Sequence, residues 1–400
     1  MKKKLMMSVV LLISVFALSG CSKTEDNMVK ESVESAQAVE STTVEVAETE
    51  LSEIYSYQIS INGTELQFPM WYSDFGAAGF TYMGDATETL EPLHYTIEDI
   101  WTMDGVEVET SLGNRSINTQ PYTKCMVSGI DLDSDRLEGV DWEIILPKGI
   151  QYGVSTREDI LAAYGTPTYD FEDRWYYKMT YGSENTQKIY LRVDKESGVL
   201  GRIEIQNFVD LEGVDNSVNE AVPEDVTKYT APTEVGDDLY RFNAEIEGHL
   251  YTFPCPVSEF LANGFTILKD ENEDVVAAAS LSGLTLSYNE QSILVMVANY
   301  ADYATIPENC FVISFETNKD SWGNHPTLDV TVPCGIKLEE SEASLKEKIS
   351  AFYYEEEKKN DYKSYVVYNP NGTRQDYFSF RVKEGIVAGI EFETDNIPGY

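Results

Sequence analysis

The feature that most constrains the fold of this chain is an internal match at an offset of 185 residues. Residues 57–69 align without a gap with residues 242–254, and both segments end in Phe-Pro. At the same offset Phe75 corresponds to Phe260 and Cys125 to Cys310, and one residue of drift then aligns Pro147 with Pro333. An offset held over so many positions indicates an internal duplication. The sequence therefore predicts two copies of one unit.

The first part of each predicted copy begins with a hairpin. The turn is Asn-Gly in one copy and Glu-Gly in the other, both typical of tight hairpins. A short helix follows, at residues 70–78 and 257–263, and a glycine ends it in each case. We expect several strands next, with residues 124–131 paired to 142–146 and, in the second copy, 310–315 paired to 328–332.

The second part of the first copy, residues 149–207, predicts one helix followed by a three-stranded meander. Ser155 and Glu158 have the spacing of a capping box, and Gly165 followed by Pro167 ends the helix. Strands are expected at residues 174–181, 189–194 and 199–206, because large apolar side chains alternate there with polar ones. Trp175 and Tyr177 should therefore face the core.

The same part of the second copy predicts a helix at residues 341–352 and strands at 362–368, 376–382 and 386–393. Residues 353–360 form a charged run between them. The predicted fold class is α+β, with two tandem repeats in which short helices pack on antiparallel β-meander sheets. The predicted domains are residues 54–208 and 239–400. They are joined by an acidic linker at 209–238 that contains Pro and Gly.

The N-terminus has the pattern of a bacterial lipoprotein signal. Lys2, Lys3 and Lys4 precede an apolar run at residues 5–18, and Leu-Ser-Gly then leads to Cys21. Residues 1–20 are the predicted signal peptide, and Cys21 is the predicted site of lipidation by acyl chains such as palmitate. Residues 21–53 contain too few large apolar side chains to fold and predict a disordered tether. We expect the chain on the extracytoplasmic face of the cell membrane, held there only by its lipid anchor.

Composition limits the class of partner. The chain is 42% apolar and long enough for two full cores, and its formal net charge is −40. A chain with no overall basic field is not suited to bind the phosphates of nucleic acid. We therefore expect no nucleic-acid partner.

Three short motifs carry a family resemblance. They are GVSTRE at residues 153–158, YGTP at 164–167 and RWYY at 174–177, followed by the meander. This pattern resembles the β-lactamase-inhibitor-protein-like fold, which the SmpA/OmlA-type assembly lipoproteins share. The whole chain resembles tandem-repeat lipoproteins of Gram-positive bacteria. The resemblance implies the fold of about sixty residues and non-catalytic binding through an open sheet face.

Catalytic and metal-binding signals are weak. His94, His249 and His325 have no metal-ligand spacing, and no nucleophile elbow, phosphate loop or zincin motif occurs. The alternating acids at residues 131–135 start like a calcium loop, but Arg136 stands where such a loop needs Gly. We expect no cofactor and no metal, and interpret this segment as an acidic turn.

Four cysteines follow Cys21: Cys125, Cys255, Cys310 and Cys334. Cys310 and Cys334 flank a predicted strand pair and could form a disulfide. Copy one lacks the equivalent of Cys334, since Lys148 stands there, and buried free thiols are the alternative. The sequence does not decide between these two interpretations.

The outward face of the predicted meander is the candidate binding site. It gathers Arg and Tyr, which are enriched where protein interfaces are strongest. The candidate residues are Arg174, Tyr176, Lys178, Tyr190, Arg192 and Arg202. The alternative is a solvated face whose cations balance nearby acids.

The preferred function is a tethered, non-catalytic binding or assembly module for a protein or cell-wall ligand, acting through open sheet faces. One alternative is an envelope hydrolase that uses a carboxylate pair in a groove between the copies. Another is a solute-binding lipoprotein, although the sequence lacks the alternating strands and helices of a parallel-sheet binder.

Overall fold

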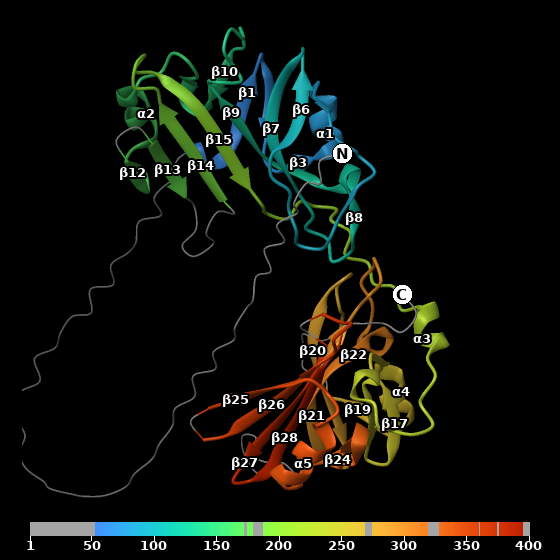
Figure 1. Ribbon diagram of the computed structural model, residues 1–400. Helices are drawn as coiled ribbons and strands as arrows, with labels where there is room; N and C mark the ends of the chain where they lie inside the picture. The colour runs from blue at the N-terminus through green and yellow to red at the C-terminus, as the bar shows by residue number, and fades with distance from the viewer. Residues whose placement is uncertain are drawn as a thin grey trace, which may run out of the picture. The chain divides into compact units, whose positions relative to one another are not determined.

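The computed structural model describes residues 53–171, 174–178, 187–268, 274–318, 328–359, 361–373 and 376–394 (Figure 1). The predicted signal peptide, Cys21, His325 and almost all of the predicted tether lie outside these residues. The described chain is mostly antiparallel strands with five short α-helices. The helices are α1 (Tyr72–Ala77), α2 (Arg157–Tyr164), α3 (Glu224–Lys228), α4 (Val257–Ala262) and α5 (Glu342–Ile349). The architecture is thus α+β with a dominant β content.

The N-terminal half contains a nine-stranded sheet, here called the large N-terminal sheet. Its order is β12-β13-β14-β15-β9-β7-β6-β4, and β3 also pairs with β9. The strands are β3 (Met70–Trp71), β4 (Thr81–Tyr82), β6 (Asp99–Met103), β7 (Val106–Gly113), β9 (Met126–Asp133), β12 (Tyr169–Phe171), β13 (Arg174–Lys178), β14 (Gln187–Val193) and β15 (Leu200–Asn207). The predicted meander is the β13–β14–β15 part of this sheet.

Two smaller sheets complete this half. One has the order β11-β10-β1-β2 and the other pairs β5 with β8. Their strands are β1 (Gln58–Ile61), β2 (Thr64–Gln67), β5 (Thr89–Leu90), β8 (Gln120–Pro121), β10 (Ile144–Leu146) and β11 (Ile150–Gln151). Short 3-10 turns lie at Glu53–Ser56, Tyr122–Lys124 and Pro147–Gly149. The predicted Asn-Gly hairpin is β1–β2.

The C-terminal half has its own sheets. The large one has the order β19-β20-β21-β22-β28-β27-β26-β25, with β18 on β22, and the small one has the order β17-β16-β23-β24. The strands are β16 (Asn243–Ile246), β17 (His249–Thr252), β18 (Cys255–Pro256), β19 (Thr266–Ile267), β20 (Leu281–Tyr288), β21 (Gln291–Ala298), β22 (Phe311–Asn318), β23 (Val330–Val332), β24 (Ile336–Lys337), β25 (Tyr354–Lys358), β26 (Lys363–Tyr368), β27 (Tyr377–Lys383) and β28 (Ile386–Glu393). Its 3-10 turns are Leu239–Arg241, Pro307–Asn309 and Pro333–Gly335.

Each half has a separate hydrophobic core between one face of its large sheet and a layer made of its small sheet and helices. In the N-terminal half this core includes Trp175, Ile203, Ile144 and Ile160, from β13, β15, β10 and α2. The other face of the large N-terminal sheet points away from this core. Trp175 and Tyr177 are buried on the inner face, as the alternation in the sequence predicts.

Helix α2 begins one residue later than the sequence pattern suggests. Thr156, rather than Ser155, is the N-cap, and it forms a capping box with Asp159 instead of Glu158. Ser155 is buried, and its hydroxyl accepts a hydrogen bond from the Gln151 amide at 2.9 Å. The predicted cap was therefore wrong in register, although Gly165 ends the helix as expected.

Two predicted strand pairs are also wrong. Strand β9 pairs with β7 and β15, whereas β10 pairs with β1 and β11 in the small sheet. Likewise β22 and β23 belong to different sheets. Strand β25 occupies the charged run at residues 353–360, and helix α3 lies within the predicted linker. Both were missed because exposed edge strands and single-turn helices carry little apolar periodicity.

Candidate functional site on the large N-terminal sheet

The structure brings the candidate binding residues together on the outer face of β13, β14 and β15. Arg174 lies opposite Arg192, and Tyr176 lies opposite Tyr190. Arg192 in turn lies opposite Arg202. Lys178 ends β13, and only its backbone is described.

Two of the three candidate arginines, Arg192 and Arg202, form ion pairs with acids of strand β9. Arg202 binds Asp131 through two nitrogens and lies 3.4 Å from Asp133. Arg192 is 3.1 Å from Asp133. Lys188 and Glu204 add a further pair at 2.7 Å. The basic concentration expected from the sequence is therefore an ion-pair network with three cations and three carboxylates.

Burial and ion pairing have opposite effects on the pKa of Asp131 in this network. Burial raises the pKa of Asp131 above its ordinary value, and the hydrogen bond and charge of Arg202 oppose that rise. The hydrogen bond to Asp131 is also the main reason that the pKa of Arg202 is raised. Arg202 is thus held as a cation, and its two hydrogen bonds fix Asp131 on β9, so the pair suits structural stabilisation.

Tyr190 does not have the exposure that its prediction as a contact residue requires. It is only 5% exposed, because the Tyr176 ring packs on it with centroids 4.8 Å apart. The guanidinium of Arg202 lies 5.4 Å from its ring centroid. Tyr190 therefore supports the face from below and offers little surface to a partner.

The exposed aromatic surface lies at the adjacent edge of the sheet, on β12. Tyr169 and Phe171 are 48% and 58% exposed, and their rings stack with centroids 6.5 Å apart. Phe171 also meets Tyr176 edge-on at 6.4 Å. Together these residues and Tyr190 form a continuous series, which we call the aromatic row: Tyr169, Phe171, Tyr176 and Tyr190.

The aromatic row is held in place by the residue between its two exposed members. Asp170 accepts a hydrogen bond from the indole nitrogen of the buried Trp175 at 2.9 Å. Asp170 also accepts a hydrogen bond at 2.8 Å from the guanidinium of Arg157, which lies at the start of α2. Strand β12 is thereby fixed to the core and to α2, so Tyr169 and Phe171 project from a fixed strand. Sequence reasoning missed both, and their signal was the Tyr-x-Phe alternation after Pro167.

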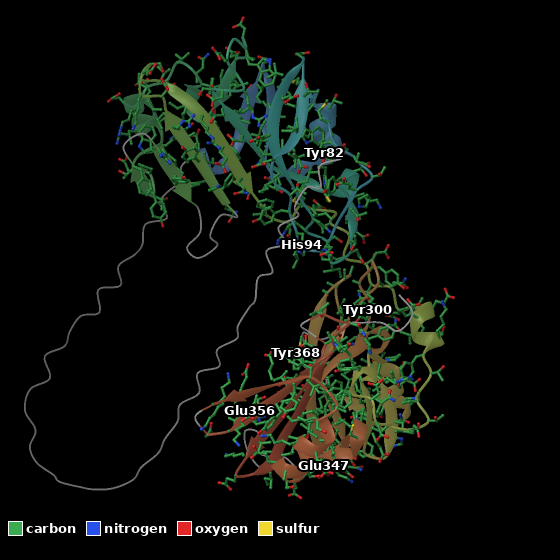
Figure 2. The ribbon with its side chains drawn as sticks, in the orientation of Figure 1. Tyr82, His94, Tyr300, Glu347, Glu356 and Tyr368 are labelled. Atoms are coloured by element: carbon green, nitrogen blue, oxygen red, sulfur yellow. The ribbon has the colours of Figure 1, made fainter. Side chains whose placement is uncertain are left out.

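The described residues offer no cluster of three or more His, Cys, Asp or Glu side chains arranged to hold a metal ion. His94, labelled in Figure 2, contacts the Pro92 carbonyl through Nδ1 at 2.9 Å and lies 3.8 Å from Glu91. Asp131 and Asp133, which began the partial calcium pattern, instead lie on β9 and bind arginine.

The alternative of a disulfide between Cys310 and Cys334 is wrong, because both thiols are free in the structure. Cys310 is buried and its Sγ contacts the Ile306 carbonyl, whereas the Cys334 thiol contacts the Asp237 carbonyl. The strand pair that was expected to bring them together does not exist, since β22 and β23 lie in different sheets. Cys125 and Cys255 are also free and buried.

Comparisons of this chain with protein-family models, with curated proteins and with solved structures found no match. Among the described helices, none has the length and apolar character needed to cross a membrane.

Proposed function

We propose that this chain is a lipid-tethered, extracytoplasmic and non-catalytic binding protein whose aromatic row contacts a protein or cell-wall component. The observation that carries the proposal is the exposure of Tyr169 and Phe171 on a strand fixed to the core. Rigid aromatic side chains provide large contact areas at little cost in conformational entropy. The anchor proposed at Cys21 rests on the sequence pattern alone.

We interpret the two halves as tandem copies, residues 54–208 and 239–400, joined by the linker at 209–238. The interpretation is supported by the 185-residue offset and by the order of successive strands, which is the same in the two large sheets. In the second copy β25 takes the edge position of β12, and it carries exposed Glu355, Glu356 and Glu357 (Figure 2 labels Glu356). The proposed binding role therefore belongs to the first copy.

A site-specific crosslinking experiment tests the contact. A photoreactive phenylalanine analogue replaces Phe171 in the full-length lipoprotein, within intact envelopes. The matched control places the same analogue at Tyr353, which is 69% exposed and precedes the edge strand of the second copy. We expect a discrete adduct from position 171 that Tyr169→Ser abolishes, and none from position 353. Equal adducts at both positions, or no adduct at 171, would contradict the proposed site.

A separate experiment tests the anchor. Because the lipid is proposed to be the only membrane attachment, Cys21→Ala should move the chain from the membrane fraction to the soluble fraction. Metabolic labelling with a fatty acid should fail on the same variant. A variant that stays in the membrane fraction would show that another attachment exists.

A further inference from the structure

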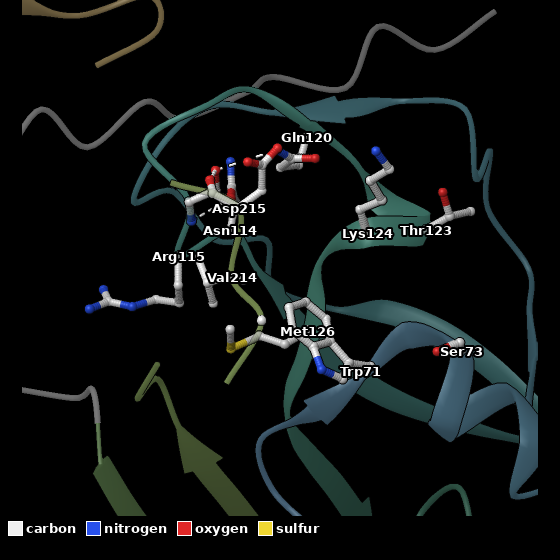
Figure 3. A pocket seen from close by; sticks show the side chains of 13 residues that line it. Trp71, Ser73, Asn114, Arg115, Gln120, Thr123, Lys124, Met126, Val214 and Asp215 are labelled. Carbon is white, nitrogen blue, oxygen red and sulfur yellow. Dashed lines mark hydrogen bonds between the residues drawn. The ribbon is translucent and has the colours of Figure 1, made fainter. Parts of the chain in front are cut away.

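A pocket of about 370 Å³ lies in the N-terminal half (Figure 3), and no residue of the aromatic row lines it. Its walls come from the start of α1, the loop after β7, the start of β9 and the linker at residues 213–215. This volume is at the small end of ligand pockets, which typically measure about 300–1,000 Å³. A ligand that fills it is therefore smaller than a typical drug molecule.

The loop and the linker that form one wall are held by a closed set of hydrogen bonds. The side-chain Nδ2 of Asn114 donates to the carbonyls of Leu90, Glu91 and Asn118. The Ser116 hydroxyl donates to the Asp215 carbonyl, which fastens the linker to the loop. These polar groups are already satisfied inside the protein. They preform the wall and are not free to bind a ligand.

The floor of the pocket is apolar. Trp71 and Met126 lie opposite each other in the β3–β9 pair, and Met126 is only 1% exposed. The indole of Trp71 is half-buried and lines the pocket. The partly exposed indole of Trp71 provides a surface for an apolar group of modest size, and the buried Met126 lies behind it.

Two opposite charges remain at the rim. The ammonium of Lys124 has no ion-pair partner among the described residues, whereas Arg115, the other cation of the lining, is paired with Asp210 at 2.7 Å. In Figure 3 the Arg115 side chain extends away from the other labelled side chains. The Asp215 carboxylate accepts from the Ser217 amide at 3.1 Å, from the Ser217 side chain and from Gln120 at 3.5 Å. These hydrogen bonds, with a smaller effect from the charge of Lys124, lower the pKa of Asp215. A carboxylate offers about four acceptor sites, so it can also accept from a ligand cation.

The corresponding place in the C-terminal half carries different side chains. Asn309, which corresponds to Lys124 at the 185-residue offset, donates to the linker carbonyls of Glu220 and Ala221. Tyr300, which corresponds to Arg115, packs on Phe311 with ring centroids 5.5 Å apart. The pocket with an available lysine is thus particular to the N-terminal half.

We propose that this pocket binds a small zwitterion with an apolar side chain, that is, a free apolar α-amino acid or the equivalent end of a short peptide. Lys124 binds the carboxylate, Asp215 binds the ammonium, and the indole of Trp71 contacts the apolar side chain. The formal charge of −40 favours this ligand over a simple anion, because a zwitterion experiences no net long-range repulsion from the protein. This small-molecule site goes beyond the proposed function on the aromatic row.

The test is a titration of the purified full-length chain with leucine, N-acetylleucine and leucinamide, followed by tryptophan fluorescence and by calorimetry. N-acetylleucine keeps only the negative charge, and leucinamide keeps only the positive one. We expect saturable binding of leucine, and binding of each analogue weaker by about tenfold or more, because each loses one charge-assisted contact. Trp71→Phe should remove the fluorescence change while calorimetric binding remains.

Variants locate the two charges. Lys124→Gln and Asp215→Asn should each weaken leucine binding by about tenfold. The surface changes Lys337→Gln and Asp104→Asn, which remove the same charges outside the pocket, should leave binding unchanged. Circular dichroism checks that each variant is folded. Absence of saturable leucine binding to the parent chain would overturn the proposal. So would equal binding of N-acetylleucine, which would identify a simple anion site instead.

Discussion

Arg202 on β15 donates hydrogen bonds to Asp131 on β9 from two guanidinium nitrogens, although the residues are 71 positions apart in the chain. The Nε–Oδ1 distance is 2.9 Å, and both side chains are largely shielded from solvent. This pair joins the predicted meander to the central strand of the large N-terminal sheet. Because of this pair, Arg202 adds no unpaired positive charge to the outer face.

Removal of the arginine alone should destabilise the fold. Arg202→Met leaves the partly buried Asp131 without its main partner, and we expect a loss of about 2 kcal/mol in the free energy of unfolding. Urea denaturation measures this loss. Arg115→Met is the matched control, because its partner Asp210 is 69% exposed and such pairs contribute little.

A double variant separates the cost of an orphaned charge from the value of the pair. Arg202→Met combined with Asp131→Leu should recover most of the lost stability, since a well-packed apolar pair can replace a half-buried ion pair. If the double variant is less stable than Arg202→Met, the pair itself stabilises the fold and this explanation is wrong.

The capping box of α2 gives a prediction for stability and its pH dependence. Thr156→Ala should cost about 1 kcal/mol, the usual effect of removing an N-cap side chain. Hydrogen bonds from the Thr156 backbone and hydroxyl lower the pKa of Asp159. Because that pKa is lower in the folded state, its stabilising effect is present above the ordinary carboxyl range and is lost as the pH falls through the lowered value.

Thermal unfolding, measured from neutral to acid pH, tests this predicted loss of stability. Asp159→Asn should be less stable than the parent at neutral pH, and the difference should shrink on acidification. Ser341→Ala, at the cap of α5, is the control: Ser341 accepts from the Ser344 amide at 3.2 Å, but residue 344 is no carboxylate. If the stability difference between Asp159→Asn and the parent does not change with pH, the lowered pKa of Asp159 is not the cause of that difference.

Thiol counting tests the cysteine assignment directly. Four thiols of the described residues are free, and only Cys334 is not fully buried. Burial also raises the pKa of Cys125 and of Cys310 to about 12, which suppresses their thiolates further. A maleimide should therefore modify Cys334 in the native protein, slowly at neutral pH and faster as pH rises, because its own pKa is also raised.

Denaturation without reductant should expose the other three thiols to the reagent. Cys334→Ser should abolish native modification and leave the other three to be modified after denaturation. Two reactive thiols in denaturant, and four only after reduction, would instead demonstrate a disulfide.

The accuracy of sequence reasoning here depended on how local the determining interactions are. The alternation of Trp175 and Tyr177 placed β13 with its correct face, and the Asn-Gly turn placed the β1–β2 hairpin, because both signals lie within a few residues. The alternative given for this face, cations that balance nearby acids, describes Arg202 and Arg192 correctly. The identity of the acid could not be predicted, since Asp131 reaches Arg202 only when β9 pairs with β15.

The same limit applies to the candidate site. Tyr190 has the residue type of an interface contact, but its burial depends on how Tyr176 and Arg202 pack over it. Tyr169 and Phe171 were overlooked because three exposed residues give no inward-facing alternation to detect. The contact proposed for them rests on the edge position of β12, which the sheet order defines.

The side chain of Asn118 connects three segments and allows a last prediction. Its Oδ1 accepts from the Ala304 amide at 2.7 Å, and its Nδ2 donates to the linker carbonyls of Asp215 and Ser217. Ala304 is fully buried, so Asn118→Ala leaves its N–H without a partner. We expect a loss of about 2 kcal/mol in the free energy of unfolding, the usual cost of an unsatisfied buried donor.

Hydrogen exchange at the Ala304 amide distinguishes this cause from a general loss of packing. The amide should be protected in the parent chain and should exchange much faster in Asn118→Ala, while the amide of Ile203 in the N-terminal core keeps its protection relative to global unfolding. Asn216→Ala is the control, because its exposed Oδ1 accepts only a 3.3 Å bond from the Ile117 amide and its removal should change stability by less than about 0.5 kcal/mol. If Ala304 exchanges equally fast in the parent and in Asn118→Ala, then Asn118 does not join the loop after β21 to the linker, and the loss of stability must have another origin.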